Sequence, residues 1–354
     1  MTLINDFVTV IGGRKRIQRL WIMKAVFRYT GFFLVMMSCN GAMASNEAKN
    51  DHISNSYSSD AALVYRTNVY WGDTHLHTNL SFDAYNYGNK LLGPEEAYRF
   101  AKGEAVQANN GMTAKLRRPL DFLVIADHAS NMGLMQGLTG NNSDLLSLPL
   151  GQQFASQLEG INKIVDSDRE KSVQLSRKLA MDGFTEGRVL NNQNQQTVWK
   201  AVAMLADHHN IPGKFTAFVG YEWTQLFYVL HRVIIFKDGA EKAAQSIPFS
   251  QYDSSNPEAL WSYLDAYESQ TGGEVLAIPH NGNLSNGVMF ALEDVNGKPL
   301  SADYAKARAR WEPLFEVTQI KGDSETHPEL SPTDEFSDYA TVNYDVLHNN
   351  WGQE

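Results

Sequence analysis

The chain has 354 residues, a formal net charge of -10 and a single cysteine, and 43% of its residues are hydrophobic. This composition excludes a disordered chain and a disulfide-stapled miniprotein, and one cysteine excludes zinc and iron–sulfur sites built from cysteine clusters. The acidic balance argues against a nucleic-acid-binding surface, so we expect no nucleic-acid partner.

The first 44 residues have the pattern of a secretory signal peptide. Six basic residues precede a short apolar run at 31–37, and small residues ending in Ala42-Met43-Ala44 follow it. This order predicts cleavage after residue 44 and export, to the periplasm in our interpretation. The apolar run is far shorter than the ~20 residues of a spanning helix, so we expect no stable membrane span after cleavage. The alternatives are a buried first helix and a lipoprotein anchored at Cys39.

After a polar leader at 45–66, ordered structure is expected to begin with the short apolar run at 69–71. Pro94 and the two glutamates after it predict the first turn of a helix. The continuous apolar run at 121–126 is typical of a strand covered on both faces.

The second half of the domain alternates between strands and helices. Residues 140–210 are polar with helical spacing, which predicts a helical insertion, and the tract 191–196 within it is expected to be a loop. The later predicted elements are strands at 215–219 and 233–236, a helix at about 257–270 capped by Asn256, and strands at 274–278 and 314–317. The alternation predicts one α/β domain over 67–354 with a mainly parallel sheet.

Histidine or carboxylate residues stand directly after four apolar runs. They are His75-Leu76-His77, Asp127-His128, Glu222 and Pro279-His280-Asn281. Because the carboxyl ends of barrel strands build the active site in α/β barrels, these side chains predict one shared pocket.

The segment His75-Leu76-His77 is the most specific of these signals. Residues i and i+2 of an extended segment point the same way, so both imidazoles can bind one ion from one side. Asp73 is a candidate for a carboxylate that orients a ligand, and Asp83 is a candidate ligand. The alternatives are a pair of surface histidines and a turn aspartate.

His128 is also predicted as a ligand, and Asp127 as either a ligand or a group that orients one. Glu222 is predicted as a bridging ligand, because a charge at the end of a buried strand is expensive unless it is paired or metal-bound. His231 and His280 are candidate ligands, with core histidines as the alternative. The pair His208-His209 is expected to cap a helix or to lie on the surface.

A set of histidines and carboxylates without thiolates suits divalent Zn, Mn or Fe, and so many candidates predict two or three ions. Such sites activate a water molecule for a displacement, typically at phosphorus. We assign catalytic roles to Glu222 and Asp127, and we expect Arg232 and Lys321 to contact an anionic substrate.

The order H-x-H, D-H, Glu, His and P-H-N resembles the PHP (polymerase and histidinol phosphatase) domain. Residues 70–78, 121–128, 220–223, 279–281 and 321–325 are similar to exported bacterial proteins that carry a domain of unknown function within this superfamily. The resemblance implies a distorted β/α barrel with a trinuclear metal site and phosphoesterase activity. By position, it implies a first ion (His75, His77), a bridge (Glu222), a second ion (His231, His280) and a third ion (Asp83, His128).

PHP barrels end with an Asp-x-His pair, for which the nearest substitutes here are Glu325-Thr326-His327 and Asp345-Val346-Leu347-His348. We therefore expect a barrel that is truncated at its carboxyl end.

The functional hypothesis is an exported metal-dependent hydrolase of a phosphorylated or other small-molecule substrate. The alternative is a catalytically inactive metal- or ligand-binding PHP-like protein. An amidohydrolase-type barrel would share the H-x-H segment, but its strand-end lysine or late aspartate is not evident. The sequence indicates no particular oligomeric state.

Overall fold

The computed structural model describes residues 68–341, apart from residues 141, 166, 186 and 295. The predicted signal peptide (1–44) and leader (45–66) lie outside the described residues, as do His52 and residues 345–348. Among the described residues, no helix has the length and apolar character needed to cross a membrane.

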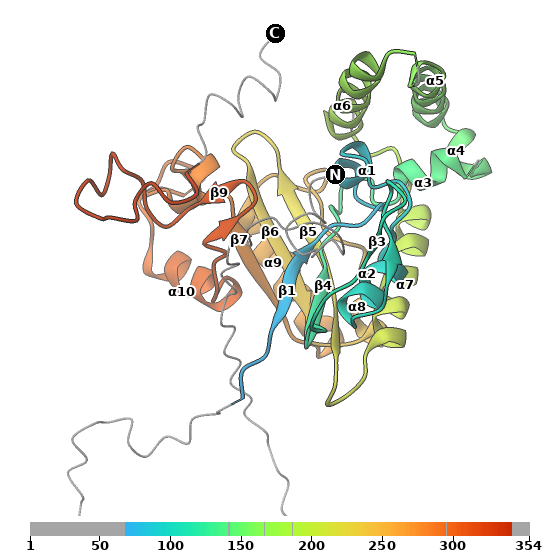
Figure 1. Ribbon diagram of the computed structural model, residues 1–354. Helices are drawn as coiled ribbons and strands as arrows, with labels where there is room; N and C mark the ends of the chain where they lie inside the picture. Colours follow the sequence, from blue (N-terminus) through green and yellow to red (C-terminus); the bar gives the residue numbers. More distant parts are fainter. Residues whose placement is uncertain (1–67, 141, 166, 186, 295, 342–354) are drawn as a thin grey trace, which may run out of the picture.

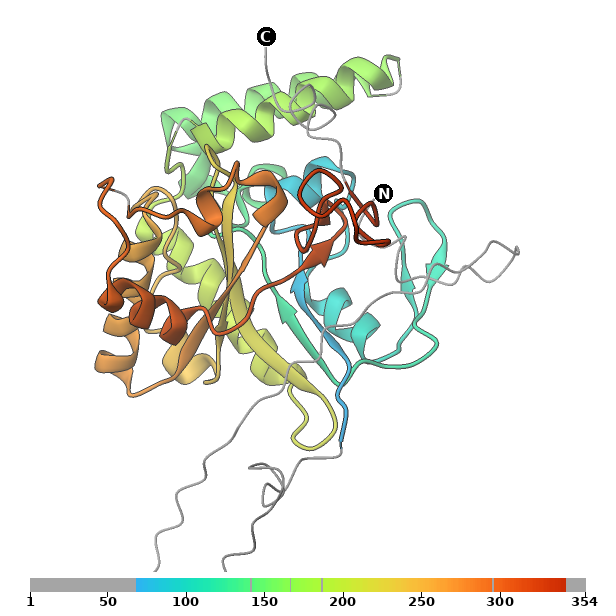
Figure 2. The same ribbon diagram turned by 90° about the vertical axis from the view of Figure 1, so that its left-hand side faces the viewer.

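A five-stranded sheet, curled like half of a barrel, runs through the centre of the structure (Figure 1, Figure 2). Its strands lie in the order β1 (Gly72–Leu76), β4 (Phe122–Ile125), β5 (Thr216–Gln225), β6 (Leu230–Phe236) and β7 (Val275–His280). The α/β class is confirmed. The closed barrel implied by the PHP resemblance stays a prediction.

The expectation of a mainly parallel sheet is wrong. Strand β4 lies parallel to β1 and β5, but β6 lies antiparallel to both β5 and β7. Only residues 226–229 connect β5 to β6, and so short a connection permits only an antiparallel neighbour.

Four of the predicted strands are present as β4, β5, β6 and β7, with changed ends. Strand β5 continues to Gln225, so Glu222 lies within the strand instead of after it. Strand β1 begins at Gly72, beyond the run at 69–71. A Cβ atom at Gly72 would come within 2.4 Å of the Phe122 ring, so the pairing with β4 needs a glycine there.

The last predicted strand, at 314–317, is absent. The backbone N–H of Glu316 donates to the Pro279 carbonyl at 3.0 Å, but no further ladder forms. The chain then makes a separate hairpin of β8 (Thr318–Gln319) and β9 (Gly322–Asp323).

Helices cover the outer face of the sheet (Figure 1). They are α2 (Pro94–Ala101) against β4, α7 (Asn192–His209) against β5, and α9 (Pro257–Thr271) with α10 (Ala302–Trp311) against β7. The predicted starts of α2 and α9 are confirmed: Glu96 accepts a hydrogen bond from the Gly93 N–H at 3.0 Å, and Asn256 caps α9. The smaller elements are α1 (Phe82–Asn86), β2 (Val106–Gln107), β3 (Thr113–Ala114), α3 (Leu134–Thr139), α8 (Ala240–Ala243), η1 (Gly282–Leu284) and η2 (Val288–Phe290).

The predicted insertion is helical, and it contains α4 (Ser143–Leu146), α5 (Pro149–Ile164) and α6 (Arg169–Thr185). Helices α5 and α6 pack side by side beyond one end of the sheet, above α1 and α3 in Figure 1. The loop expected at 191–196 is wrong: Asn191 is the N-cap of α7, and its side chain accepts a hydrogen bond from the Asn194 N–H at 2.8 Å. An asparagine-rich tract therefore starts a helix by capping it.

Both faces of the sheet are largely buried from β4 to β7. Tyr221, Trp223 and Ile234 lie in the large core under the outer helices, whereas Val124 and Val233 pack together in a smaller core on the inner face. Since side chains alternate along a strand, Glu222 and His231 share the inner face.

A substitution at Gly220, on β5, tests how closely the strands pack. Its added Cβ would meet Val124 Cγ1 at 2.4 Å and the Ile234 carbonyl oxygen at 2.7 Å. We expect Gly220→Ala to lower the free energy of unfolding by about 1–3 kcal/mol, measured by urea denaturation. The added Cβ of Gly160→Ala in α5 meets no atom within 4 Å, so this substitution should raise the free energy of unfolding by about 0.5–1 kcal/mol. Equal effects of the two substitutions would contradict this account.

Candidate metal centre

One fully buried carboxylate, that of Glu222, lies at the centre of the candidate site. Nitrogens of five histidines lie within 3.5 Å of its oxygens: His77 Nε2 (2.8 Å), His75 Nε2 (3.2 Å), His231 Nδ1 (2.5 Å), His280 Nε2 (3.2 Å) and His128 Nδ1 (3.5 Å). All five were predicted ligands, and the structure brings them together.

Strand pairing explains this convergence. Strands β1, β4 and β5 are parallel, so the segments that carry His75, His128 and Glu222 meet at one edge, and His128 forms a backbone bridge with Glu222. In the antiparallel half, His231 lies directly opposite His280. The centre therefore joins both halves of the sheet.

Asp83, in the first turn of α1, extends the centre on one side. Its carboxylate lies 3.5 Å from His77 Nδ1 and 3.4 Å from His128 Nε2. Asp83 therefore lies among the candidate ligands, and its role as a ligand stays a prediction.

The described residues contain four groups of three side chains whose ligand atoms lie within 4.8 Å of one another. These groups are His75/His77/Glu222, His75/His280/Glu316, His77/Asp83/His128 and His128/Glu222/His231. Because the groups share members, they form one connected centre that could hold a metal ion.

Two of the buried imidazoles, those of His231 and His280, are in the neutral form that binds metals. Burial lowers the pKa of His231 to about 3 and that of His280 to about 4, despite the opposing charge of Glu222. Both are therefore neutral at pH 7. Nε2 of His231 and Nδ1 of His280 are buried without a hydrogen-bond partner. Orphaned buried nitrogens of this kind fit a bound ion.

The carboxylates are ionised. Burial alone would raise the pKa of Glu222, but the imidazoles of His128, His231 and His280 beside it hold this pKa well below its usual range. The pKa of Asp83 is likewise held low against burial by His77 and His128. Ionised carboxylates beside neutral imidazoles make a hard, oxygen-and-nitrogen donor set suited to Zn, Mn or Fe.

The two other carboxylates predicted near the centre accept hydrogen bonds from backbone N–H groups. Asp127, nearly fully buried, accepts hydrogen bonds from the Thr78 N–H at 2.5 Å and from Thr78 Oγ1 at 2.6 Å. Asp73 accepts one from the His75 N–H at 2.7 Å. Neither belongs to the four groups, and both fix the chain around the H-x-H segment.

The two predicted substrate contacts lie in different places. Arg232 faces the outer side of the sheet, where its Nε donates to Glu312 Oε1 at 3.0 Å, so the structure does not bring it to the centre. Lys321 is half-buried in the turn between β8 and β9, and its charge lowers the pKa of both His231 and Glu316. Lys321 therefore lies near the rim of the centre.

The histidines outside the predicted ligand set have other surroundings. His209 is buried at the end of α7, between Lys102 Nζ at 2.8 Å and Glu95 Oε2 at 2.7 Å, so it ties α7 to α2 instead of lying on the surface. His327 is exposed and does not reach the four groups.

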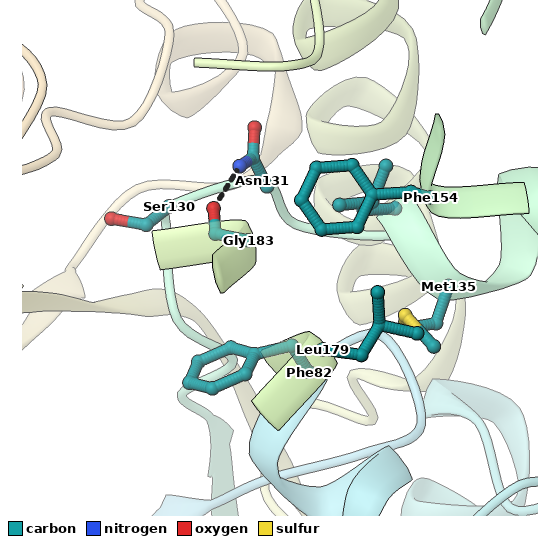
Figure 3. Close-up of a pocket in the computed structure, with 8 residues that line it drawn as sticks. Phe82, Ser130, Asn131, Met135, Phe154, Leu179 and Gly183 are labelled. Carbon is teal, nitrogen blue, oxygen red and sulfur yellow. Dashed lines mark hydrogen bonds between the residues drawn. The ribbon is translucent and has the colours of Figure 1, made fainter. Parts of the chain in front are cut away.

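The helical insertion meets the centre at a small cavity of about 10 Å³, drawn in Figure 3. Asn131 Nδ2 donates to the Gly183 carbonyl at 2.8 Å across this joint. Phe82, which also lines the cavity, lies 5.2 Å from the His128 ring. The volume is about that of one water, so the joint is packing and not a substrate pocket.

The sequence analysis missed Glu316. Its Oε2 lies 2.8 Å from His75 Nδ1, although 241 residues separate the two side chains. The sequence did contain a signal, which is a carboxylate inside the apolar run 314–317. Burying an unpaired charge is costly, and this argument, which identified Glu222, applies to Glu316 as well.

Metal affinity should rise with pH. Burial lowers the pKa of His75, but Glu316 and Glu222 outweigh it and raise this pKa to about 9, so the ion-free ring is protonated at pH 7. An incoming ion must displace that proton, which favours binding at higher pH. Between pH 7 and 8, we expect the zinc affinity to rise about tenfold per pH unit for each proton that the ion displaces. Calorimetry measures this affinity. An affinity independent of pH would contradict this.

Comparison with known proteins places the chain in a family. A family described as a protein of unknown function, DUF3604, matches residues 64–354, which include every residue of the centre. No curated protein and no solved structure matches the chain. Since the match covers most of the sequence, the chain belongs to the DUF3604 family.

Proposed function

We propose that this protein is a metal-dependent hydrolase that cleaves phosphate esters, with two or three divalent ions in the Glu222 centre. The observation that carries the proposal is the convergence of five imidazoles and Asp83 around one buried, ionised carboxylate. Structural metal sites need four ligands, whereas this centre offers more donors than one ion can use.

Divalent ions in such a centre would lower the pKa of a water molecule and offset charge that builds up on the attacked phosphoryl group. In the overall reaction the water oxygen adds to phosphorus, the ester P–O bond breaks and the alcohol leaves with a proton. Glu222 would serve neighbouring ion positions at once, since its two oxygens face different histidines. Asp127 would act by holding Thr78, and with it the H-x-H segment.

Phosphorus as the reacting centre is supported by the PHP resemblance and by the position of Lys321. An ammonium at the rim attracts an anionic ester, and among the described residues it has no ion pair to satisfy it. The signal-peptide pattern of residues 1–44 supports export and a periplasmic location.

The central experiment is an assay of phosphomono- and diesters with protein loaded with Mn or Zn. We expect turnover by the wild type and a loss of activity of at least about 100-fold in Glu222→Gln. Removing a residue that only supports a metal ligand can cost up to about 100-fold in activity, and Glu222 is itself a predicted ligand. The exposed Glu329→Gln is the matched control and should retain activity. If the metal-loaded wild type turns over neither ester class, the proposal is wrong.

Lys321→Gln should raise KM for a phosphate ester about tenfold and leave metal content unchanged, because it removes one charged hydrogen bond to the substrate. Lys298→Gln removes an exposed charge that is not part of the centre and should change neither value. Steady-state kinetics with metal analysis measure both quantities, and equal KM values for the two variants would exclude the role of Lys321.

A second candidate is a catalytically inactive binding protein. It is favoured by one observation: among the described residues, no Asp-x-His pair reaches the centre, and His327 is exposed. This candidate requires no more than one ion per chain, and His75→Ala should leave ligand binding intact. Metal analysis of the purified protein therefore separates the two candidates.

A further inference from the structure

The His75 ring lies between two carboxylates. Its Nε2 faces Glu222 Oε2 at 3.2 Å, on the side of the centre that also carries His77 Nε2. Its Nδ1, on the far side of the ring, forms a hydrogen bond of 2.8 Å with Glu316 Oε2. Each nitrogen therefore has its own carboxylate partner.

The other rings of the centre are held differently. The nearest Nδ1 partner of His77 is Ser81 Oγ at 2.9 Å, and that of His128 is Thr224 Oγ1 at 2.5 Å. A hydroxyl fixes a ring but carries no charge. Asp83 lies farther away, at 3.5 Å from His77 Nδ1 and 3.4 Å from His128 Nε2. Among the described histidines of the centre, His75 is distinguished by a carboxylate at 2.8 Å on the side of the ring away from Glu222.

The fold holds Glu316 firmly in this position. Its backbone N–H donates to the Pro279 carbonyl at 3.0 Å, directly beside His280 on β7, and Ser324 N–H donates to the next residue, Val317, at 2.7 Å. The Glu316 side chain is only 11% exposed. A buried carboxylate fixed by its own backbone is expected to have one stable contact geometry.

We propose that Glu316 is a positioning residue that accepts the Nδ1–H hydrogen bond of His75, keeps the Nε2 lone pair directed at the Glu222 side, and strengthens metal binding at the His75/His77/Glu222 position. This inference rests on the metal centre of the proposed function. A carboxylate behind a ligating histidine fixes its tautomer and raises its basicity as a ligand.

The other role open to Glu316 is direct ligation, in the group it forms with His75 and His280. A neutral imidazole has one lone pair for an ion, and its other ring nitrogen carries a proton, which Glu316 Oε2 can accept at 2.8 Å from Nδ1. Nε2, by contrast, faces a carboxylate that another imidazole shares. The geometry therefore favours orientation of His75 over ligation by Glu316.

Glu316→Gln tests the proposal, with the exposed Glu329→Gln as the matched control. Metal-free protein is titrated with Co(II), followed by calorimetry and by the visible absorption of the bound ion. We expect Glu316→Gln to bind the same number of ions as the wild type, with one ion bound about 10–100-fold more weakly and its absorption shifted. Glu329→Gln should match the wild type.

The outcomes are distinguishable. The proposal is overturned if every ion binds with unchanged affinity, and the loss of a whole equivalent overturns it in favour of direct ligation. A wild type that binds no Co(II) instead removes the proposed function itself.

A double-mutant cycle separates positioning from general support of the fold. In a His75→Ala background, Glu316→Gln should not weaken the remaining ions further, whereas a structural role would weaken every position. If Glu316→Gln does not fold, Glu316→Asp, which keeps the charge but withdraws the carboxylate, must show the same selective weakening of one ion.

Discussion

The burial of the Glu222 carboxylate is the constraint on which the rest of this structure depends. An ionised group with no exposure costs several kcal/mol unless opposing charges or donors surround it. Here five imidazoles supply that surrounding, and they come from β1, β6, β7 and the segment after β4. The sheet must therefore be correctly paired before the carboxylate can be buried, which links the fold directly to the chemistry.

The mixed sheet meets this requirement in two ways. Its parallel half brings strand ends together at one edge, as α/β folds commonly do. Its antiparallel half places His231 opposite His280 by register, within the strands themselves. The short connection between β5 and β6 keeps His231 close to Glu222. The outer helices then cover the apolar face that faces away from the centre.

Local patterns predicted the elements whose signals are local. The apolar runs predicted β4, β5, β6 and β7, and proline with nearby capping groups predicted the starts of α2 and α9. The hairpin between β5 and β6 was not predicted, because residues 226–229 contain no glycine, proline or asparagine to mark a turn. Tract 191–196 was misinterpreted because asparagine favours both loops and helix caps.

The sequence by itself determined which donors this protein has: histidines and carboxylates set into or after apolar strands, without a thiolate in the mature chain that we predict. Only the tertiary structure decided which of them meet. His231 and Arg232 are neighbours in the chain, yet they lie on opposite faces because strand side chains alternate. Glu316 reaches His75 across 241 residues. Register and pairing between distant segments decide such contacts, and no local pattern encodes them.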